Sequence, residues 1–141
     1  IVIFLTSHRF GVSMLAELND TQEIDRKKAT AMVMRMFDNW ELQSEERTAL
    51  LGLAKENRTA LAKYKRGEPI SNSRDTLERL SHLFAIHKNL RLLYPQREVG
   101  YAWMRKPNGA FQSMSPVQVI DRYGFVGLLM VRSYLDCARG N

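Results

Sequence analysis

Few side chains in this sequence have the types and spacing needed for catalysis or metal binding. His82 and His87 are five residues apart, whereas a metal-binding pair on one helical face is four residues apart. His87 falls within an apolar helical arc, which predicts a core histidine whose hydrogen bonds are satisfied. Cys137 is the only cysteine, with neither a CxxC partner nor a neighbouring histidine to activate its thiol. We therefore expect no enzymatic activity, no metal and no cofactor.

Basic side chains that could bind phosphate are concentrated between residues 55 and 66, where Glu56 is the single acid. A short helix is predicted over roughly residues 58–66, with Leu61 and Tyr64 facing inward. Its basic face could enter the DNA major groove, with some side chains on phosphates and others on base edges. A solvated basic face without a ligand would have the same composition. The predicted DNA contacts are Arg58, Thr59, Lys63, Lys65 and Arg66.

The segment before the basic helix favours a helix-turn-helix arrangement. Ser44, followed by Glu45 and Glu46, is typical of a helix start, because acids are stabilised near the positive end of the helix dipole. This first helix is predicted to end near Gly52, and the basic helix to end at Gly67. Two short helices with a glycine near the turn match the helix-turn-helix pattern, although other helical hairpins share it.

The last predicted helix, residues 125–138, carries a second candidate binding surface. One of its sides combines apolar and charged residues at spacings of 4, 3 and 4, which indicates a partner surface. Scattered exposed apolar residues are also normal on any protein. The predicted core face consists of Val126, Met130, Val131, Tyr134, Leu135 and Ala138. The predicted partner surface consists of Phe125, Leu129, Arg132 and Asp136.

The helix expected to organise the others is Ser73–Tyr94. Its apolar residues sweep an arc of roughly 200°, wider than the stripe of a surface helix. We therefore expect neighbours on more than one side of it. Ser73 is the predicted N-cap, and Pro95 ends the helix.

Before this central helix, an amphipathic helix is predicted from Gln22 to about Trp40, starting after a break at Asn19-Asp20-Thr21 with Thr21 as its cap. Residues 1–20 would form an arm that packs on the domain or on a partner. The methionines of the amphipathic helix are predicted to fill the core. They are Met32, Met34 and Met36. The predicted core stripe is Ala29, Val33, Met36, Phe37 and Trp40.

After the central helix, the sequence predicts a short helix over Arg97–Arg105 and a turn at residues 106–109. Ser115-Pro116 is typical of a helix start, with a cap followed by proline in the first turn. That helix is predicted to end at Gly124, before the last helix begins.

The bulk composition limits the class of protein. A length of 141 residues fits one domain or two small modules that share a core. The 21 Lys and Arg residues exceed the 15 acids, which favours an acidic partner such as nucleic acid, although many soluble proteins carry such a charge. A single cysteine excludes an internal disulfide and fits a cytoplasmic location. The longest apolar run, Ile1–Leu5, is too short to span a membrane.

Several motifs, in their order along the chain, resemble a known family. The run LERLSHLFAIHKNLRLLYP, then AWMRKPN, SPVQVID and GLLMVRSYLDCARG, is similar to the toxin-binding region of Xre/MbcA/ParS-type antitoxins. The preceding NWELQSEERTALLGL and KYKRG resemble the helix-turn-helix segment of that family. The resemblance extends over about residues 35–141.

This resemblance implies an all-α protein, a small helical bundle that acts as the antitoxin of a type II toxin–antitoxin system. It would be divided into an unassigned arm (1–20), a helix-turn-helix module (21–70) and a toxin-binding module (71–141). The implied partner is a RES-domain toxin that consumes NAD. The C-terminal residues of the antitoxin would block the toxin's active-site cleft. Carried onto this chain, the blocking residues are Arg139, Gly140 and Asn141.

The family also implies a homodimer that binds operator DNA to regulate its own operon. Two alternatives remain from the residues alone. The first is a helix-turn-helix transcriptional regulator without a toxin partner. The second is an adaptor bundle that recognises some other protein through Phe125 and Leu129.

Overall fold

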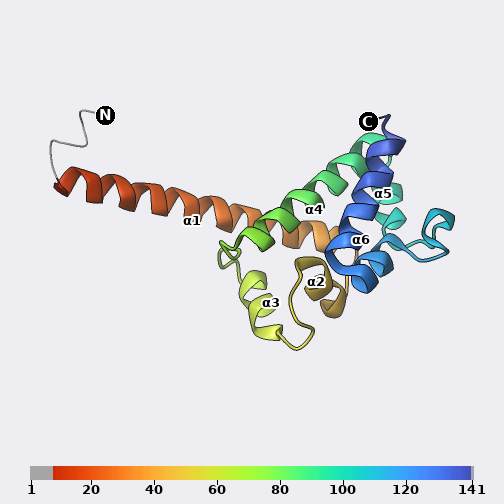
Figure 1. The fold of residues 1–141 in the computed structure, drawn as a ribbon, viewed down its shortest axis with the longest axis horizontal. Helices are drawn as coiled ribbons and strands as arrows, with labels where there is room; N and C mark the ends of the chain where they lie inside the picture. Colours follow the sequence, from red (N-terminus) through yellow and green to blue (C-terminus); the bar gives the residue numbers. More distant parts are fainter. Residues whose placement is uncertain (1–7, 141) are drawn as a thin grey trace.

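Helices account for all the regular secondary structure in the described part of the chain (Figure 1). The computed structural model describes the backbone of residues 8–140 and the side chains of residues 22–140. This confirms the predicted all-α class. The helices are α1 (His8–Asn39), α2 (Ser44–Leu51), α3 (Arg58–Lys65), α4 (Arg74–Leu93), α5 (Arg97–Trp103), the short 3-10 turn η2 (Gly109–Phe111) and α6 (Pro116–Ala138).

The long helix α1 runs without interruption from His8 to Asn39, and its N-terminal part projects from the body of the protein (Figure 1). The predicted break at Asn19-Asp20-Thr21 is therefore wrong. Those residue types lower helix stability by only a few tenths of a kcal/mol each, and neither glycine nor proline occurs between residues 12 and 39 to stop the helix there. The predicted packing of the side chains of residues 1–20 lies outside the described residues.

The C-terminal half of α1 buries the predicted stripe. Val33, Phe37 and Trp40 are buried, and Met36 lies with them in the core. The prediction for the methionines holds for Met34 and Met36 but is wrong for Met32, which is 58% exposed. Met32 lies on the other side of the helix from Met34, so the adjacent elements cannot cover both.

The helix α4 is covered on several sides, as predicted, by α1, α2, α5 and α6. Leu80, Leu83, Ile86 and Leu90 are buried along its length. Its start is fixed by Ser73, whose side chain accepts a 3.2 Å hydrogen bond from the backbone N–H of Thr76. This confirms the predicted cap.

The helix α6 consists of two arms that meet at Gly124. There the backbone leaves the helical region, with φ 62° and ψ −133°, which glycine adopts without steric cost. The helix end predicted at Gly124 is thus confirmed. The arms pack so closely that a Cβ on Gly127 would lie 2.3 Å from the carbonyl oxygen of Val119. Ser115 caps the start of the first arm, as predicted, and also forms a capping box with Gln118.

One hydrophobic core includes residues from both of the predicted modules. Leu50 and Leu61 from residues 21–70 belong to the same buried cluster as Leu83 and Leu128 from residues 71–141. An ion pair between Arg105 and Glu46, at 2.9 Å, also joins the two segments. The division into two modules remains a prediction.

Candidate functional site

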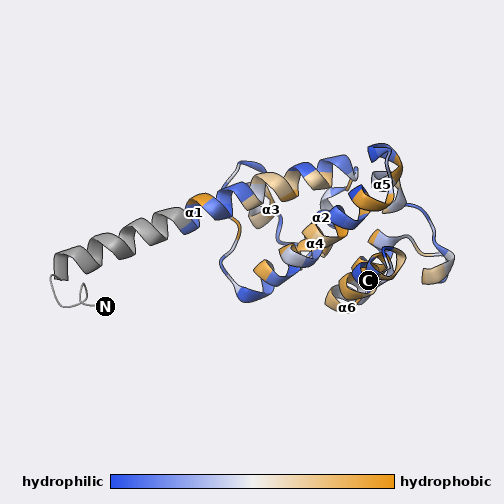
Figure 2. Cartoon of the chain, turned by 90° about the horizontal axis from the view of Figure 1, so that it is seen from above, coloured by the Kyte–Doolittle hydropathy of each residue, from blue (hydrophilic) through white to orange (hydrophobic). Residues whose placement is uncertain are grey.

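An apolar face on α6 is left uncovered in the structure. Val126 is 62% exposed. Leu129 and Met130, one turn further along the second arm, and Tyr123, at the end of the first arm, are also exposed. Much of α6 carries the hydrophobic colour in Figure 2. We call this surface the apolar face of α6; it consists of Tyr123, Val126, Leu129, Met130 and Tyr134.

The predicted core face of this helix is correct for Val131 and Leu135 and wrong for the other four residues. Val131 and Leu135 are buried together with Leu128, whereas the others are exposed. The apolar residues surround most of the helix, so their periodicity does not show which part of the circumference α4 covers. The residues wrongly assigned to the core are Val126, Met130, Tyr134 and Ala138.

Aromatic contacts hold Tyr134 in place at the end of the apolar face. Its ring stacks on Trp103 of α5, with centroids 5.8 Å apart and planes at 17°. Phe111 of η2 meets the same ring edge-on at 5.3 Å. The loop that carries Phe111 is closed by a hydrogen bond from the N–H of Asn108 to the carbonyl of Met114. Tyr134 is therefore exposed but ordered.

The predicted partner residues near the C-terminus instead face α4. The buried amide of Asn89, which is 1% exposed, donates from Nδ2 to Oδ1 of Asp136 at 2.9 Å. Its Oδ1 accepts a 2.7 Å hydrogen bond from Nη1 of Arg139. The sequence reasoning missed Asn89, although an amide inside an apolar helical arc needs partners when it is buried.

Arg132 also bonds within the chain. Its Nη1 lies 2.8 Å from Nδ1 of His82. Because a guanidinium can only donate, the imidazole nitrogen must accept, and His82 is then neutral with its proton on Nε2. Burial, and next the positive charge of Arg132, lower the pKa of His82 below its ordinary value.

The predicted partner strip is thus divided between two environments. Phe125 is half-buried, with the His82 ring edge-on at 5.4 Å and the Arg79 guanidinium 5.6 Å from its ring centroid. Leu129 belongs to the apolar face. Gly140 follows α6 with φ 87°, and Asn141 lies outside the described residues.

The predicted DNA-contacting residues all lie exposed on or next to α3. Leu61 and Tyr64 are buried beneath them, as predicted. Three of the basic residues have exposed local partners: Arg58 with Glu45 at 3.9 Å, Lys65 with Ser44 at 3.4 Å and Arg66 with Glu68 at 3.0 Å. Such exposed contacts stabilise weakly, so a phosphate could replace them. The exposed set is Arg58, Thr59, Lys63, Lys65 and Arg66.

His87 does not have the satisfied core position predicted for it. Its Nδ1 is buried without a hydrogen-bond partner among the described residues. The ring stacks on Tyr101, with centroids 6.1 Å apart, and lines a pocket between α1, α4 and α5. The cause is a gap between these helices, which helical periodicity does not reveal.

Comparison with known proteins assigns the C-terminal part of the chain to a domain family. Residues 89–140 match the family model for the antitoxin Xre/MbcA/ParS C-terminal toxin-binding domain. The matched segment contains both the apolar face and the bonds from Asn89 to Asp136 and Arg139. An uncharacterized protein, y4oB of Sinorhizobium fredii (strain NBRC 101917 / NGR234), is 35% identical over 106 residues, which cover 75% of this chain and 80% of that protein.

Fold and match together define an all-α protein with a toxin-binding domain. Residues 89–140 belong to the toxin-binding domain family of the Xre/MbcA/ParS antitoxins, which supports an antitoxin role with a toxin as partner. Among the described helices, none is both long and apolar enough to cross a membrane.

Proposed function

We propose that the toxin binds to the apolar face of α6 and that it is a RES-domain toxin that consumes NAD. The observation that supports this site is the exposure of five apolar side chains within the toxin-binding domain. An exposed apolar patch is a frequent mark of a protein interface. Tyr134 is already ordered by Trp103 and Phe111, so binding would cost little additional side-chain entropy there.

Inhibition would be steric, without catalysis by the antitoxin. The hydrogen bond from Arg139 to Asn89 fixes the last turn of α6. Gly140 and Asn141, which follow in the sequence, would then enter the active-site cleft of the toxin and block NAD. Arg132 and Asp136 would support this end of the helix through their bonds to α4. Phe125 would hold the start of the same arm through its packing against His82.

The binding surface can be tested by co-expression with the product of the adjacent reading frame. Val126→Arg places a charge in the apolar face and should abolish protection from the toxin. Leu77→Arg is the control, because Leu77 is also an exposed apolar residue, at 39%, but lies on α4. Protection by Val126→Arg equal to that of the wild type would exclude the apolar face as the binding surface.

The blocking mechanism needs a separate pair of truncations. Deletion of residues 140–141 keeps Arg139 and its bond to Asn89, so the protein should fold and bind the toxin but protect poorly. Deletion of residues 139–141 also removes that bond and should weaken binding as well. Binding is measured by calorimetry with a catalytically inactive toxin, and folding by circular dichroism. Full protection by both truncated proteins would contradict the blocking mechanism.

We also propose that the protein, as a cytoplasmic homodimer, binds operator DNA through α3. The exposed basic residues above Leu61 and Tyr64 support this proposal. Operator affinity should fall steeply with salt, and Lys63→Ala and Arg66→Ala should each reduce the salt dependence by about one counterion. Arg74→Ala is the control, because this exposed arginine lies on α4. Undetectable binding to the upstream DNA at low salt would exclude DNA binding.

Finding operator binding but no toxin partner would favour a transcriptional regulator instead. The match of residues 89–140 to a toxin-binding domain argues against this alternative.

A further inference from the structure

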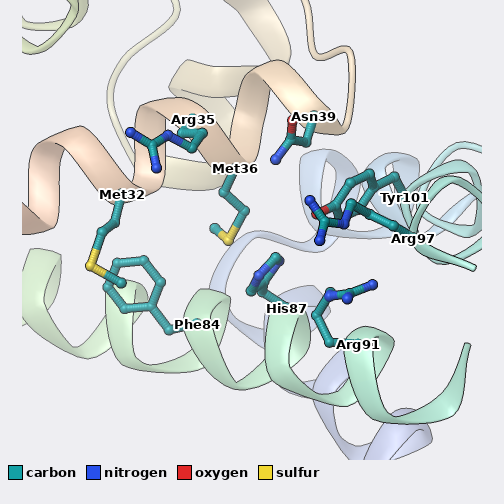
Figure 3. A pocket seen from close by; sticks show the side chains of 9 residues that line it. All are labelled: Met32, Arg35, Met36, Asn39, Phe84, His87, Arg91, Arg97 and Tyr101. Atoms are coloured by element: carbon teal, nitrogen blue, oxygen red, sulfur yellow. The ribbon is translucent and has the colours of Figure 1, made fainter. Parts of the chain in front are cut away.

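A pocket of about 320 Å³ lies between α1, α4 and α5 (Figure 3). None of its lining residues comes from α3 or α6, so it is separate from both surfaces proposed above. Its volume is at the lower end of the range of about 300–1,000 Å³ found for small-molecule sites. The pocket is therefore large enough for a small organic ligand.

The pocket is lined by three arginines and by no carboxylate. Arg35 comes from α1, Arg91 from α4 and Arg97 from the start of α5. None of these three has a salt bridge to another described residue. On other parts of the surface, Arg47 and Arg105 each pair with an acid. Positive charge at the pocket is thus left uncompensated.

Two polar atoms at the pocket lack partners. Nη1 of Arg91 and Nδ1 of His87 are buried without a hydrogen bond among the described residues. A buried polar group without a partner is destabilising, so a small side-chain adjustment that turns these covered atoms toward a ligand would be favourable. The pKa of His87 is lowered by burial and then by the charges of Arg91 and Arg97.

The other wall of the pocket is apolar. Met32 and Met36 reach down from α1, and Phe84 faces Met32 from α4 (Figure 3). His87 points from α4 toward α1 between this apolar part and the side chains of Arg91 and Arg97, whereas Arg35 lies on α1 at the Met32 end (Figure 3). The pocket therefore combines a cationic end with an apolar end.

We propose that this pocket binds an organic phosphomonoester. The phosphate would be held by Arg91 and Arg97, with Arg35 on the α1 side, because guanidinium groups form paired hydrogen bonds with phosphate oxygens. The apolar portion of the ligand would lie against Met32 and Phe84. This inference does not depend on which toxin the protein binds or on whether it binds DNA.

The experiment is an NMR titration of the full chain with inorganic phosphate and, separately, with phenyl phosphate. Both probes should give saturable shifts of His87 and of the backbone amides around Arg91 and Arg97. Arg91→Gln and Arg97→Gln should each weaken binding by about tenfold or more, as expected for loss of a charged hydrogen bond. Arg97 is exposed, so its variant tests the site even if Arg91→Gln does not fold.

Lys88→Gln is the matched control, because it removes one positive charge from an exposed position on α4 outside the pocket lining. It should leave both affinities unchanged within about twofold, since exposed charges act weakly at a distance. An equal loss in Lys88→Gln and Arg97→Gln would mean that only diffuse charge attracts the anion, which would overturn the proposal.

The organic part of the ligand is tested by comparing the two probes. Phenyl phosphate should bind more tightly than inorganic phosphate, and Met32→Ala should reduce this difference. Met32 is exposed, so its replacement should leave the fold intact. Equal affinities in the wild type would overturn the assignment of an organic ligand. If the NMR signals of the pocket residues shifted only after the toxin was added, the pocket would bind an acidic segment of a protein. That result would overturn the proposal of an organic phosphate ligand.

Discussion

Asn89 of α4 accepts a 2.7 Å hydrogen bond from Nη1 of Arg139, fifty residues later in the chain. The other side of the same amide donates to Asp136 at 2.9 Å. One buried side chain therefore holds the last turn of α6 against the central helix. The residues proposed to block the toxin follow directly from this turn.

Replacement of Asn89 by alanine should loosen the end of α6. Asp136 and Arg139 would each lose a hydrogen bond to this amide, and a hydrogen bond to a charged group typically contributes about 1.5–3 kcal/mol. We expect Asn89→Ala to lower the free energy of unfolding by that amount in a urea titration. The exposed Asn72 provides the control, and Asn72→Ala should stay within about 0.5 kcal/mol of the wild type. Equal urea midpoints for the two variants would contradict the role of Asn89.

The bond between Arg132 and His82 predicts a dependence of stability on pH. The pKa of His82 is lowered in the folded protein, so the unfolded chain binds a proton first as pH falls. Stability should therefore be complete above about pH 6.5, the ordinary histidine value, and decrease as pH falls through the folded-state pKa. The pKa of His87 is also lowered in the folded protein, so this group too should make stability decrease as pH falls.

The variant His82→Asn separates the two histidines. Its amide oxygen can accept from Arg132 in place of the imidazole Nδ1, and it does not titrate. The melting temperature of this variant should fall less between pH 7 and pH 5 than that of the wild type. An unchanged pH profile would show that His82 contributes nothing to the effect.

The fold was predictable where local chemistry determines it. Ser73 and Ser115 start helices because their side chains cap the first turn, and Gly52 ends α2 in the left-handed conformation. The continuous α1 was not predictable from Asn19-Asp20-Thr21. These residues suit a cap but also tolerate a helix, so local preference does not decide between the two.

The candidate site was harder to predict, because it depends on which side of α6 is covered. Val126 and Val131 are both valines, yet Val126 is exposed and Val131 is buried. The difference arises from the close approach of the two arms at Gly127 and from the packing of α6 on α4, both of which are tertiary. The exposure of the α3 residues was predictable, since Leu61 and Tyr64 mark the buried side of that helix.

Gly127 is predicted to be essential for the shape of α6. A methyl group there would meet the backbone of Val119 and Ile120, which cannot move aside as a flexible side chain could. Gly127→Ala should lower the free energy of unfolding by about 1–3 kcal/mol, as for other overpacked sites. Toxin affinity should fall with it, because the second arm must shift.

A matched glycine is available in the same region. A Cβ on Gly109 would meet nothing within 4 Å, so Gly109→Ala should change stability by no more than about 0.5 kcal/mol. Both variants are compared by thermal and urea unfolding. If Gly127→Ala were as stable as Gly109→Ala, the close approach of the arms would not constrain the helix.

The stacking of Trp103 on Tyr134 can be measured directly by a double-mutant cycle. Aromatic pairs of this geometry contribute about 0.5–1.5 kcal/mol beyond their burial. We expect Trp103→Ala and Tyr134→Ala to show a coupling in unfolding free energy of that size. The changes in unfolding free energy caused by Val126→Ala and Tyr134→Ala should add within about 0.5 kcal/mol, because no contact joins these two exposed residues.

The same double-mutant cycle can be measured with toxin affinity in place of unfolding free energy. If Trp103 acts by ordering Tyr134, then Trp103→Ala should weaken binding in the wild-type background but have much less effect once Tyr134 is alanine. Tyr134→Phe keeps the stacked ring and should retain most of the affinity. Equal losses from Trp103→Ala in both backgrounds would instead mean that Trp103 contacts the toxin itself.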